Sequence, residues 1–182
     1  MNRSVNDRQM KLNGHLDHNA LCLVFDLYSQ AIFKYALRLG MDVTTADQVV
    51  GDVFSRLIEQ TTKGEGPRSN LRSYLYQIAY HRIIDLVREG KRTVCLDDIG
   101  GTDNEVSLAS QVEEHILLET LSSAINNQLT EEQRHVIILR FQEGLTLKET
   151  ADIMGKKLNA IKALQKRGVE KLQKIYDEEY EA

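Results

Sequence analysis

TLKETADIMGKKLNAIKALQKRGVEKL, residues 146–172, predicts two helices joined by a tight turn. The spacing of Ala151, Gly155 and Ile161 fits a helix-turn-helix. A small residue lets the two helices approach each other, a glycine takes the turn without steric strain, and a branched apolar residue holds the second helix on the first. This stretch therefore predicts a helix-turn-helix in the C-terminal part of the chain.

The second of these helices carries most of the local positive charge. Residues 156–174 contain one acidic residue, Glu170, and seven cations, which are Lys156, Lys157, Lys162, Lys166, Arg167, Lys171 and Lys174. Such a concentration of charge is useful where a polyanion docks. The motif and the charge together predict duplex-DNA binding, whereas the alternative is a solvated basic face on an ordinary helical protein.

Length and composition restrict the fold further. The 182 residues include one proline, 11 glycines and no tryptophan, and their number suits one domain or two small helical ones. The sequence contains no run of 18 apolar residues, which a membrane-spanning helix would need. Residues 1–19 lack the apolar segment of a signal peptide. We therefore expect a cytoplasmic protein without membrane insertion, in which Cys22 and Cys95 are free thiols.

The formal net charge of −4 hides an uneven distribution. Residues 68–92 hold six cations and two acidic residues, whereas residues 93–120 hold seven acidic residues and no cation. The basic segment 156–174 follows. Two basic surfaces separated by an acidic tether are compatible with nucleic-acid binding, even though the average charge is negative.

Apolar residues at helical spacing predict helices along most of the chain. Gly40 and Gly144 are predicted to end two of them, and Ser69 or Asn70 can cap the helix that follows. Three predicted capping boxes mark further helix starts, namely Thr45–Gln48, Thr130–Gln133 and Thr146–Glu149. No segment shows convincing strand alternation. The sequence therefore predicts an all-α fold of two small helical domains joined by an acidic flexible linker.

Residues 71–92, LRSYLYQIAYHRIIDLVREGKR, combine tyrosines and arginines on one predicted helix. Aromatic rings stack on unpaired bases, and arginines pair with phosphates. Tyr74, Tyr76 and Tyr80 therefore indicate a face that binds single-stranded nucleic acid. The alternative is that some of these rings belong to the core.

These blocks, in this order, resemble the bacterial RNA polymerase sigma factors of the extracytoplasmic-function type, over about residues 20–175. ADQVVGDVFSRLIE (46–59) resembles the family helix that binds the β′ clamp helices of the polymerase. Residues 71–92 resemble the helix that opens and reads the −10 promoter element. LTEEQRHVIILRFQEGLTLKETADIMG (129–155), followed by AIKALQKRGVEKL (160–172), resembles the C-terminal domain that binds the −35 element.

The resemblance implies four segments and a set of partners. The segments are a loose N-terminal arm (1–18), region 2 for core polymerase and −10 binding (19–92), the acidic linker (93–112), and region 4 with the helix-turn-helix (113–177). The implied partners are core RNA polymerase, through its β′ clamp helices and β flap, promoter DNA, and an anti-sigma factor. By the same resemblance, the acidic linker threads the active-site cleft of the polymerase.

At the −35 element, the second helix of the motif would enter the major groove with its N-terminal side chains toward the bases. Amide side chains suit adenine, and lysines suit guanine or phosphate. The candidate residues are Asn159, Lys162, Gln165, Lys166 and Arg167. Lys156 and Lys157 stand where the family usually has an apolar residue and then a serine cap, which leaves Asn159 as an alternative helix cap.

At the −10 element, the strands must be melted, and an extruded base needs a pocket and a stacking surface. By resemblance, the loop 63–70 and the helix after it supply them, with Arg68, Asn70, Tyr74, Tyr80, His81 and Arg82 as candidates. The candidates for polymerase binding are Asp47, Val50, Asp52 and Phe54. Gly51 lies in that same helix and should weaken it by ~1 kcal/mol relative to alanine.

Other chemistry is disfavoured. His15, His18 and Cys22 have a spacing that could bind zinc, but a structural zinc site needs a fourth ligand and none is evident. The sequence shows neither a nucleophile–base arrangement nor a phosphate loop, so we expect no enzyme activity and no cofactor.

Two alternative functions stay open. One is a stand-alone helix-turn-helix regulator that binds duplex DNA as a dimer, and the other is a helical adaptor whose basic helix binds an acidic protein.

Overall fold

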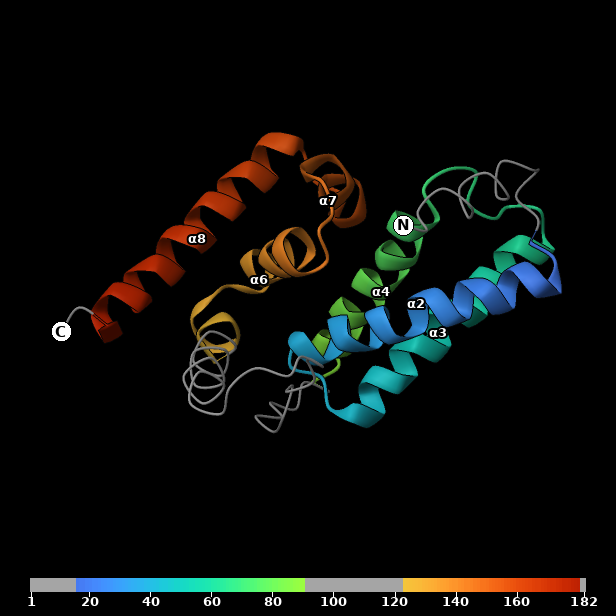
Figure 1. Ribbon diagram of the computed structural model, residues 1–182, viewed down its shortest axis with the longest axis horizontal. Coiled ribbons are helices and arrows are strands. Elements are labelled where there is room, and N and C mark those ends of the chain that lie inside the picture. Colours follow the sequence, from blue (N-terminus) through green and yellow to red (C-terminus); the bar gives the residue numbers. More distant parts are fainter. Residues whose placement is uncertain (1–15, 91–122, 181–182) are drawn as a thin grey trace, which may run out of the picture.

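The computed structural model describes residues 16–90 and 123–180, and all regular structure in these residues is helical (Figure 1). The N-terminal unit consists of α2 (His18–Arg38), α3 (Val43–Thr62) and α4 (Leu71–Arg88). The C-terminal unit consists of a helical segment at 123–128, α6 (Glu131–Ile137), the π-helical turn η1 (Ile138–Gln142), α7 (Leu147–Met154) and α8 (Leu158–Tyr180). The predicted all-α class is confirmed. The acidic linker 93–112 and most of the predicted arm lie outside the described residues.

Aspartates fix the starts of the first two helices. Asp17 caps α2 by accepting a hydrogen bond from the backbone N–H of Ala20 at 2.7 Å. The predicted Thr45–Gln48 capping box is wrong, because α3 begins at Val43 with Asp42 as its N-cap. The Asp42 carboxylate accepts the backbone N–H of Thr45 at 2.8 Å and the Thr45 hydroxyl at 2.9 Å. A carboxylate satisfies both donors and also complements the positive end of the helix dipole.

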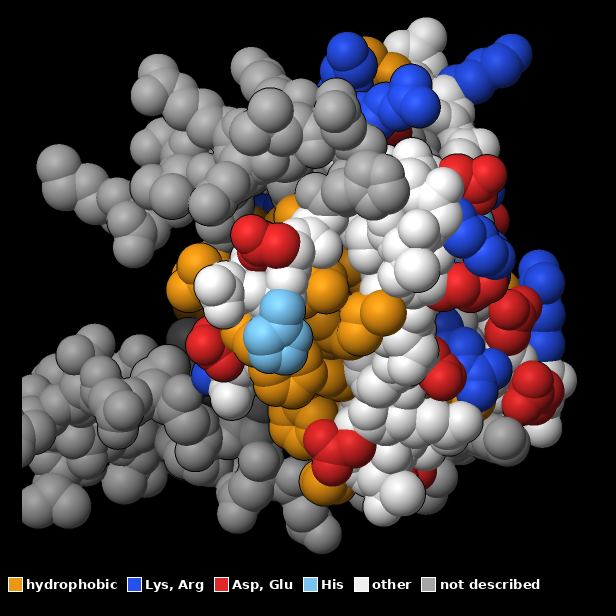
Figure 2. Space-filling model, turned by 90° about the vertical axis from the view of Figure 1, so that its right-hand side faces the viewer, with side chains coloured by type: hydrophobic (Ala, Val, Ile, Leu, Met, Phe, Trp, Pro, Cys, Tyr) orange, Lys and Arg blue, Asp and Glu red, His pale blue; other side chains and the backbone are white. Residues whose placement is uncertain are grey.

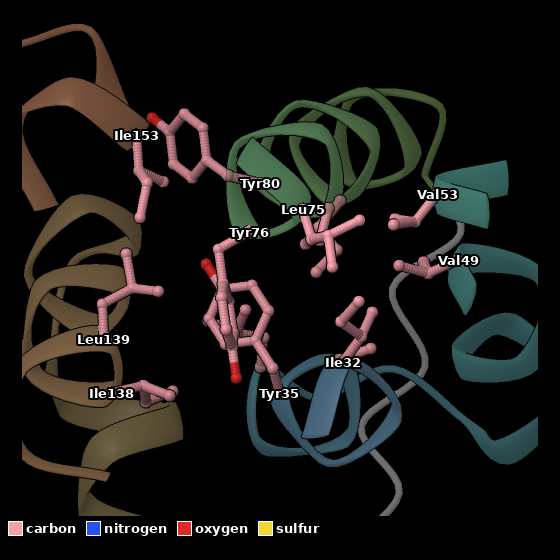
Figure 3. Close-up of a cluster of buried hydrophobic side chains, with 14 of the residues drawn as sticks. Ile32, Tyr35, Val49, Val53, Leu75, Tyr76, Tyr80, Ile138, Leu139 and Ile153 are labelled. Atoms are coloured by element: carbon pink, nitrogen blue, oxygen red, sulfur yellow. The ribbon is translucent and has the colours of Figure 1, made fainter. Parts of the chain in front are cut away.

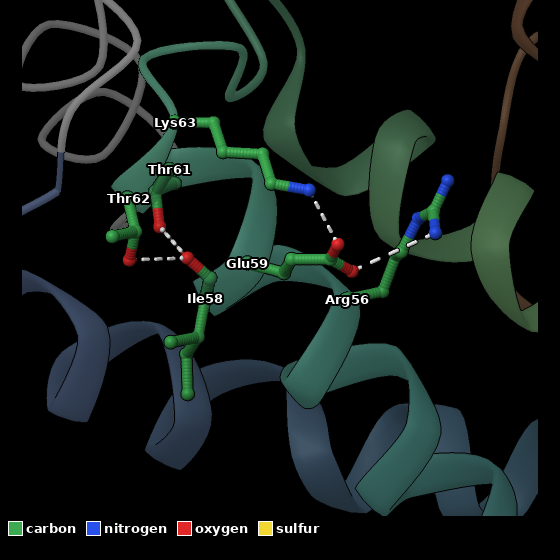
Figure 4. Close-up of polar contacts among 6 residues, drawn as sticks. All are labelled: Arg56, Ile58, Glu59, Thr61, Thr62 and Lys63. Atoms are coloured by element: carbon green, nitrogen blue, oxygen red, sulfur yellow. Dashed lines mark hydrogen bonds and ion pairs between the residues drawn. The ribbon is translucent and has the colours of Figure 1, made fainter.

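Local side-chain contacts mark the end of α3 (Figure 4). The Glu59 carboxylate lies 2.6 Å from Lys63 Nζ and 3.6 Å from Arg56 Nη1. The hydrogen bond from Lys63 lowers the pKa of Glu59 below its ordinary value. The hydroxyls of Thr61 and Thr62 both donate to the carbonyl oxygen of Ile58. These exposed ion pairs contribute little stability, but together with the hydroxyl bonds they place the point where the loop 63–70 leaves the helix.

The N-cap of α4 is an asparagine in the left-handed backbone conformation. Asn70 has φ 46° and ψ 68°, and its side chain accepts the backbone N–H of Ser73 at 3.0 Å. Asparagine tolerates this region better than most residues with a Cβ atom. Of the two predicted caps, Asn70 is confirmed. The chain therefore turns sharply from the loop into α4 at this residue.

The predicted helix caps of the C-terminal unit are confirmed. Thr130–Gln133 and Thr146–Glu149 both form complete capping boxes, in which each side chain bonds to the backbone of the other residue. Gly144 and Gly155 both have φ 62°, which glycine adopts without strain. The π-helical geometry of residues 138–142 had no sequence signal. The helix periodicity of this segment predicts only that it is helical and buried.

One continuous hydrophobic core spans both units (Figure 3). Tyr35 of α2 and Tyr76 of α4 lie between the N-terminal bundle and the segment that carries Ile138 and Leu139. Their rings meet edge to face with centroids 5.4 Å apart. Both tyrosines are fully buried. The two predicted domains are therefore packed against each other in this structure, which the predicted flexible linker did not require.

α2 is the one helix in the described part of the chain that is long and apolar enough to cross a membrane by composition. In the structure α2 packs against α3 and α4 and supplies four residues to the core, namely Val24, Ile32, Tyr35 and Ala36. Its apolar face thus serves the helical bundle.

Two glycines predict opposite effects of substitution by alanine. A Cβ atom at Gly51, on the exposed side of α3, would meet nothing within 4 Å, whereas one at Gly168 would lie 3.1 Å from Cγ1 of the buried Ile137. We expect Gly51→Ala to raise the free energy of unfolding by about 1 kcal/mol. We expect Gly168→Ala to lower it by about 1 kcal/mol, because overpacking outweighs the gain in helix propensity. Urea unfolding of the two variants measures both values, and equal shifts of the same sign would contradict the packing of α8 on α6.

Candidate nucleic-acid interface

The helix-turn-helix is formed by α7 and α8. Gly155 is the left-handed C-cap of α7, and the backbone N–H of Lys156 donates to the carbonyl of Ala151 at 3.0 Å. Ala151 and Ile161 are both buried where the helices meet. The predicted roles of these residues in the turn are confirmed. α8 begins at Leu158, so Asn159 lies within its first turn, and the alternative that Asn159 caps the helix is wrong.

Three of the five predicted −35 residues lie on one outward face of α8. Asn159, Lys162 and Lys166 are exposed and spaced by three and four residues, which places them on one face of a helix. Arg167 is also exposed, on the flank of this face. Gln165 is different, because it is half-buried and its side-chain oxygen accepts a hydrogen bond from Arg140 Nε at 3.0 Å. The structure therefore directs Gln165 toward η1.

Lys156, which the charge count placed in the basic segment, is engaged by α6. Its Nζ lies 2.7 Å from the carboxylate of Glu132. The hydrogen bond to Glu132 raises the pKa of Lys156 above its ordinary value. This lysine therefore links the turn of the motif to α6, whereas the next residue, Lys157, is exposed directly before α8.

The predicted −10 residues fall into two groups in the structure. Arg68 and His81 are exposed, and Tyr74 is half-buried. Tyr80 is buried, with its ring edge to face against the imidazole of His135 at 4.8 Å between centroids. Asn70 Nδ2 donates to the Glu149 carboxylate at 2.7 Å. Part of the face predicted to bind single-stranded DNA is thus covered by the C-terminal unit.

Arg82 and Asp52, which the sequence assigned to different partners, bind each other. Arg82 Nε donates to the Asp52 carboxylate at 2.6 Å, and Arg82 Nη1 lies 3.9 Å from Glu89. The pair joins α3 to α4 across the N-terminal bundle. Its two side chains are 25% and 43% exposed, so the contact is only partly screened by water. Both residues therefore have a structural role in addition to the roles predicted for them.

Two of the four predicted polymerase-binding residues are core residues. Val50 and Phe54 are buried, whereas Asp47 is exposed and Asp52 is half-exposed. α3 buries a stripe of seven residues that includes Val50 and Phe54, and their predicted role in polymerase binding stays a prediction. Periodicity alone does not give the width of the buried stripe.

Exposed apolar residues on α2 and α3 were missed by the sequence reasoning. Leu23, Phe25 and Leu27 on α2 and Ile58 on α3 are each about half exposed. The Phe25 ring packs on the ring of Phe54 with centroids 4.8 Å apart. Figure 2 shows apolar side chains gathered on one face of the molecule, with acidic side chains near them. Leu23 and Leu27 fall on the side of α2 opposite its buried residues, which is the signal that identifies them. Phe25 lies seven residues before the buried Ile32 and therefore on the same side of the helix as the core.

The zinc hypothesis gains no support from the described residues. His18 Nε2 and Cys22 Sγ lie 3.8 Å apart on successive turns of α2, and His15 lies outside the described residues. Within residues 16–90 and 123–180, no group of three or more potential metal ligands comes together.

Two family descriptions match this chain. Residues 24–93 match the family described as Sigma-70 region 2, and residues 127–174 match the family described as Sigma-70, region 4. These ranges contain α2 to α4 and α6 to α8, apart from the ends of α2 and α8.

Curated relatives carry related names. The chain is 28% identical to the ECF RNA polymerase sigma factor SigX of Bacillus subtilis, over 84% of this chain and 81% of that protein. It is also 28% identical to the ECF RNA polymerase sigma factor BldN of Streptomyces coelicolor, over 84% of this chain. The match spans only 58% of the length of BldN.

Solved structures share the fold. CnrH, solved in complex with the cytosolic domain of CnrY, superimposes with a TM-score of 0.66 at 21% identity, over 94% of this chain and 97% of that one. The sigma factor RpoE of Bartonella quintana, solved with the anti-sigma factor NepR, gives 0.68 at 19% identity, over 86% and 96%.

The Arg82–Asp52 pair predicts a coupling between these residues. Asp52→Ala and Arg82→Ala should each lower the free energy of unfolding by about 1 kcal/mol, and the double variant should lose less than the sum of the two. Urea unfolding of the wild-type chain and the three variants gives a coupling energy of about 0.5–1 kcal/mol if the contact forms in solution. Strict additivity would show that the two side chains act independently.

Proposed function

The chain belongs to the sigma-70 family as a sigma factor of the extracytoplasmic-function type, and we propose that it binds core RNA polymerase and directs promoter recognition and melting. The observation that supports this most strongly is the combination of two candidate DNA-binding helices in one chain. α8 presents exposed amide and ammonium groups at the start of the second helix of a helix-turn-helix, and α4 carries tyrosines after a loop that holds the exposed Arg68. A stand-alone regulator would need only the first of these.

In the proposed complex, α8 contacts the −35 element. Asn159 and Lys162 lie in the first two turns of α8, where a recognition helix meets base edges. Lys166 and Arg167 follow and suit phosphates, which position the helix without specifying sequence. Gln165 would contact DNA only after leaving Arg140, so we assign it a lesser part.

Region 2, which we assign to residues 19–92, would hold the −10 element. Arg68 and His81 are accessible to a phosphate or a base, Tyr74 is half-buried, and Tyr80 can stack on an unpaired base once the C-terminal unit moves away. For the polymerase contact, we propose Asp47 together with the exposed apolar residues Phe25 and Ile58 in place of the buried pair. Region 4 would extend over residues 113–177 and also contact the β flap.

The remaining assignments follow from the same proposal. A sigma factor acts by binding and needs no catalytic group or cofactor of its own, so we propose that this chain is not an enzyme and that it works in the cytoplasm. Because RpoE of Bartonella quintana was solved with an anti-sigma factor, we propose that an anti-sigma factor also controls this chain.

Run-off transcription tests the proposal. Purified core polymerase is incubated with a pool of promoter fragments from the same genome, with and without the chain, at low salt. We expect discrete new transcripts that depend on the chain. Lys162→Ala and Arg68→Ala should each reduce them about tenfold, because each removes one charged contact with DNA.

The matched control is Lys174→Ala. This residue lies on the same helix as Lys162, about 18 Å further along its axis, and should change transcript levels less than twofold. Absence of new transcripts, together with no co-elution of the chain and core polymerase, would contradict the proposal and favour a stand-alone DNA-binding regulator. Arg82→Ala is unsuitable as a probe, since its loss also removes the contact with Asp52.

A further inference from the structure

Glu143, which follows η1, places a charged side chain in the contact between the two units. Its side chain is only 6% exposed. One carboxylate oxygen lies 2.7 Å from Arg38 Nη1 of α2, and the other accepts a hydrogen bond from the hydroxyl of Tyr76 on α4. The guanidinium of Arg72, also on α4, donates to the backbone carbonyl of Glu143. One residue of the C-terminal unit thus engages two helices of the N-terminal unit.

Three further polar contacts join the same units on either side of Glu143. The hydroxyl of Tyr35 lies 2.7 Å from Nδ1 of the buried His135. At the start of α4, Asn70 donates to Glu149, and Gln77 Nε2 lies 3.5 Å from the carbonyl oxygen of Asp152. The contact therefore runs along α4 and has a defined register.

This contact covers part of the surface assigned to the −10 element. Tyr80 points toward Ile153 of α7, and Tyr76 lies against the segment that carries Leu139 (Figure 3). Burial raises the pKa of Tyr76, and the Glu143 carboxylate beside it acts in the same direction. Tyr80 cannot stack on a base in this arrangement, although Arg68 and His81 stay accessible.

We infer that Glu143 is an intramolecular latch that holds region 4 over the −10-binding face of region 2, so that the free chain is self-inhibited toward melted promoter DNA. The inference rests on the proposed function. A buried ion pair is sensitive to geometry, because a charge taken out of water needs its partner in place. When the units separate, Glu143, Arg38 and Arg72 are hydrated again. The latch therefore specifies the closed arrangement and still allows it to open.

Cross-linking tests whether opening is required. Gln77→Cys and Asp152→Cys are combined in a chain that also carries Cys22→Ser and Cys95→Ser, and the two thiols are bridged with a bis-maleimide that contains a reducible disulfide. We expect run-off transcription to fall at least tenfold in the bridged protein and to return after reduction. Each single-cysteine chain treated with the same reagent is the control and should stay active.

Each outcome of the cross-linking experiment has one interpretation. Full transcription by the bridged protein would overturn the inference, because promoter DNA would then be opened by a closed chain. If the reduced protein also gives no transcript, the proposed function itself fails. The two failures are therefore distinguishable in one experiment.

Binding of a labelled 15-nucleotide single strand of mixed sequence tests the role of Glu143. The apparent affinity depends on the fraction of open molecules, so Glu143→Gln and Arg38→Gln should both bind the strand several-fold more tightly than the wild-type chain. The two substitutions change the net charge in opposite directions. A purely electrostatic effect would therefore strengthen binding by the first variant and weaken binding by the second, and that result would overturn the latch.

A control and a DNA-free measurement complete the test. Glu170→Gln removes a charge from the exposed Lys166–Glu170 pair of region 4 and should leave the distance between the units unchanged. Energy transfer between dyes on the two units should show a larger mean distance in Glu143→Gln and Arg38→Gln, with unchanged circular dichroism. An unchanged distance in both variants would contradict the inference.

Discussion

A carboxylate buried between the two halves of the molecule determines how they meet. A continuous hydrophobic core spans the two halves, and apolar surfaces can slide over each other because the hydrophobic effect has no direction. An ion pair does not tolerate such sliding, since Glu143 contacts both Arg38 and Tyr76 in only one arrangement of the two halves. The packing of η1 and α7 along α4, and the burial of the tyrosines between them, depend on this contact.

Tyrosine is well suited to the surface that the two halves share. Its ring can be buried against apolar neighbours while its hydroxyl keeps a polar partner, as Tyr35 does with His135 and Tyr76 does with Glu143. The same ring can stack on a base when it is exposed. One set of side chains on α4 can therefore serve a protein contact in the closed arrangement and a nucleic-acid contact in the proposed open one.

Some of the basic side chains are also used for contacts within the protein. Lys156 and Arg82 are counted among the cations of the two basic segments, yet each is bound to a carboxylate inside its own unit. Lys162 and Lys166 remain exposed on one face of α8, and Arg68 remains exposed in the loop before α4. A basic segment of sequence thus becomes a smaller basic surface, and only that surface is available to a polyanion.

The sequence by itself determined the features that are local in the chain. Capping residues, turn glycines and helical periodicity depend on neighbours within a few positions, so the helix-turn-helix, the Asn70 cap and the all-α class could all be predicted. Prediction failed where residues distant in sequence compete. Burial of Val50 and Phe54, the Arg82–Asp52 pair and the contacts of Glu143 involve residues from separate helices. Only the tertiary structure decided them, because pairing and burial depend on which surfaces meet in space.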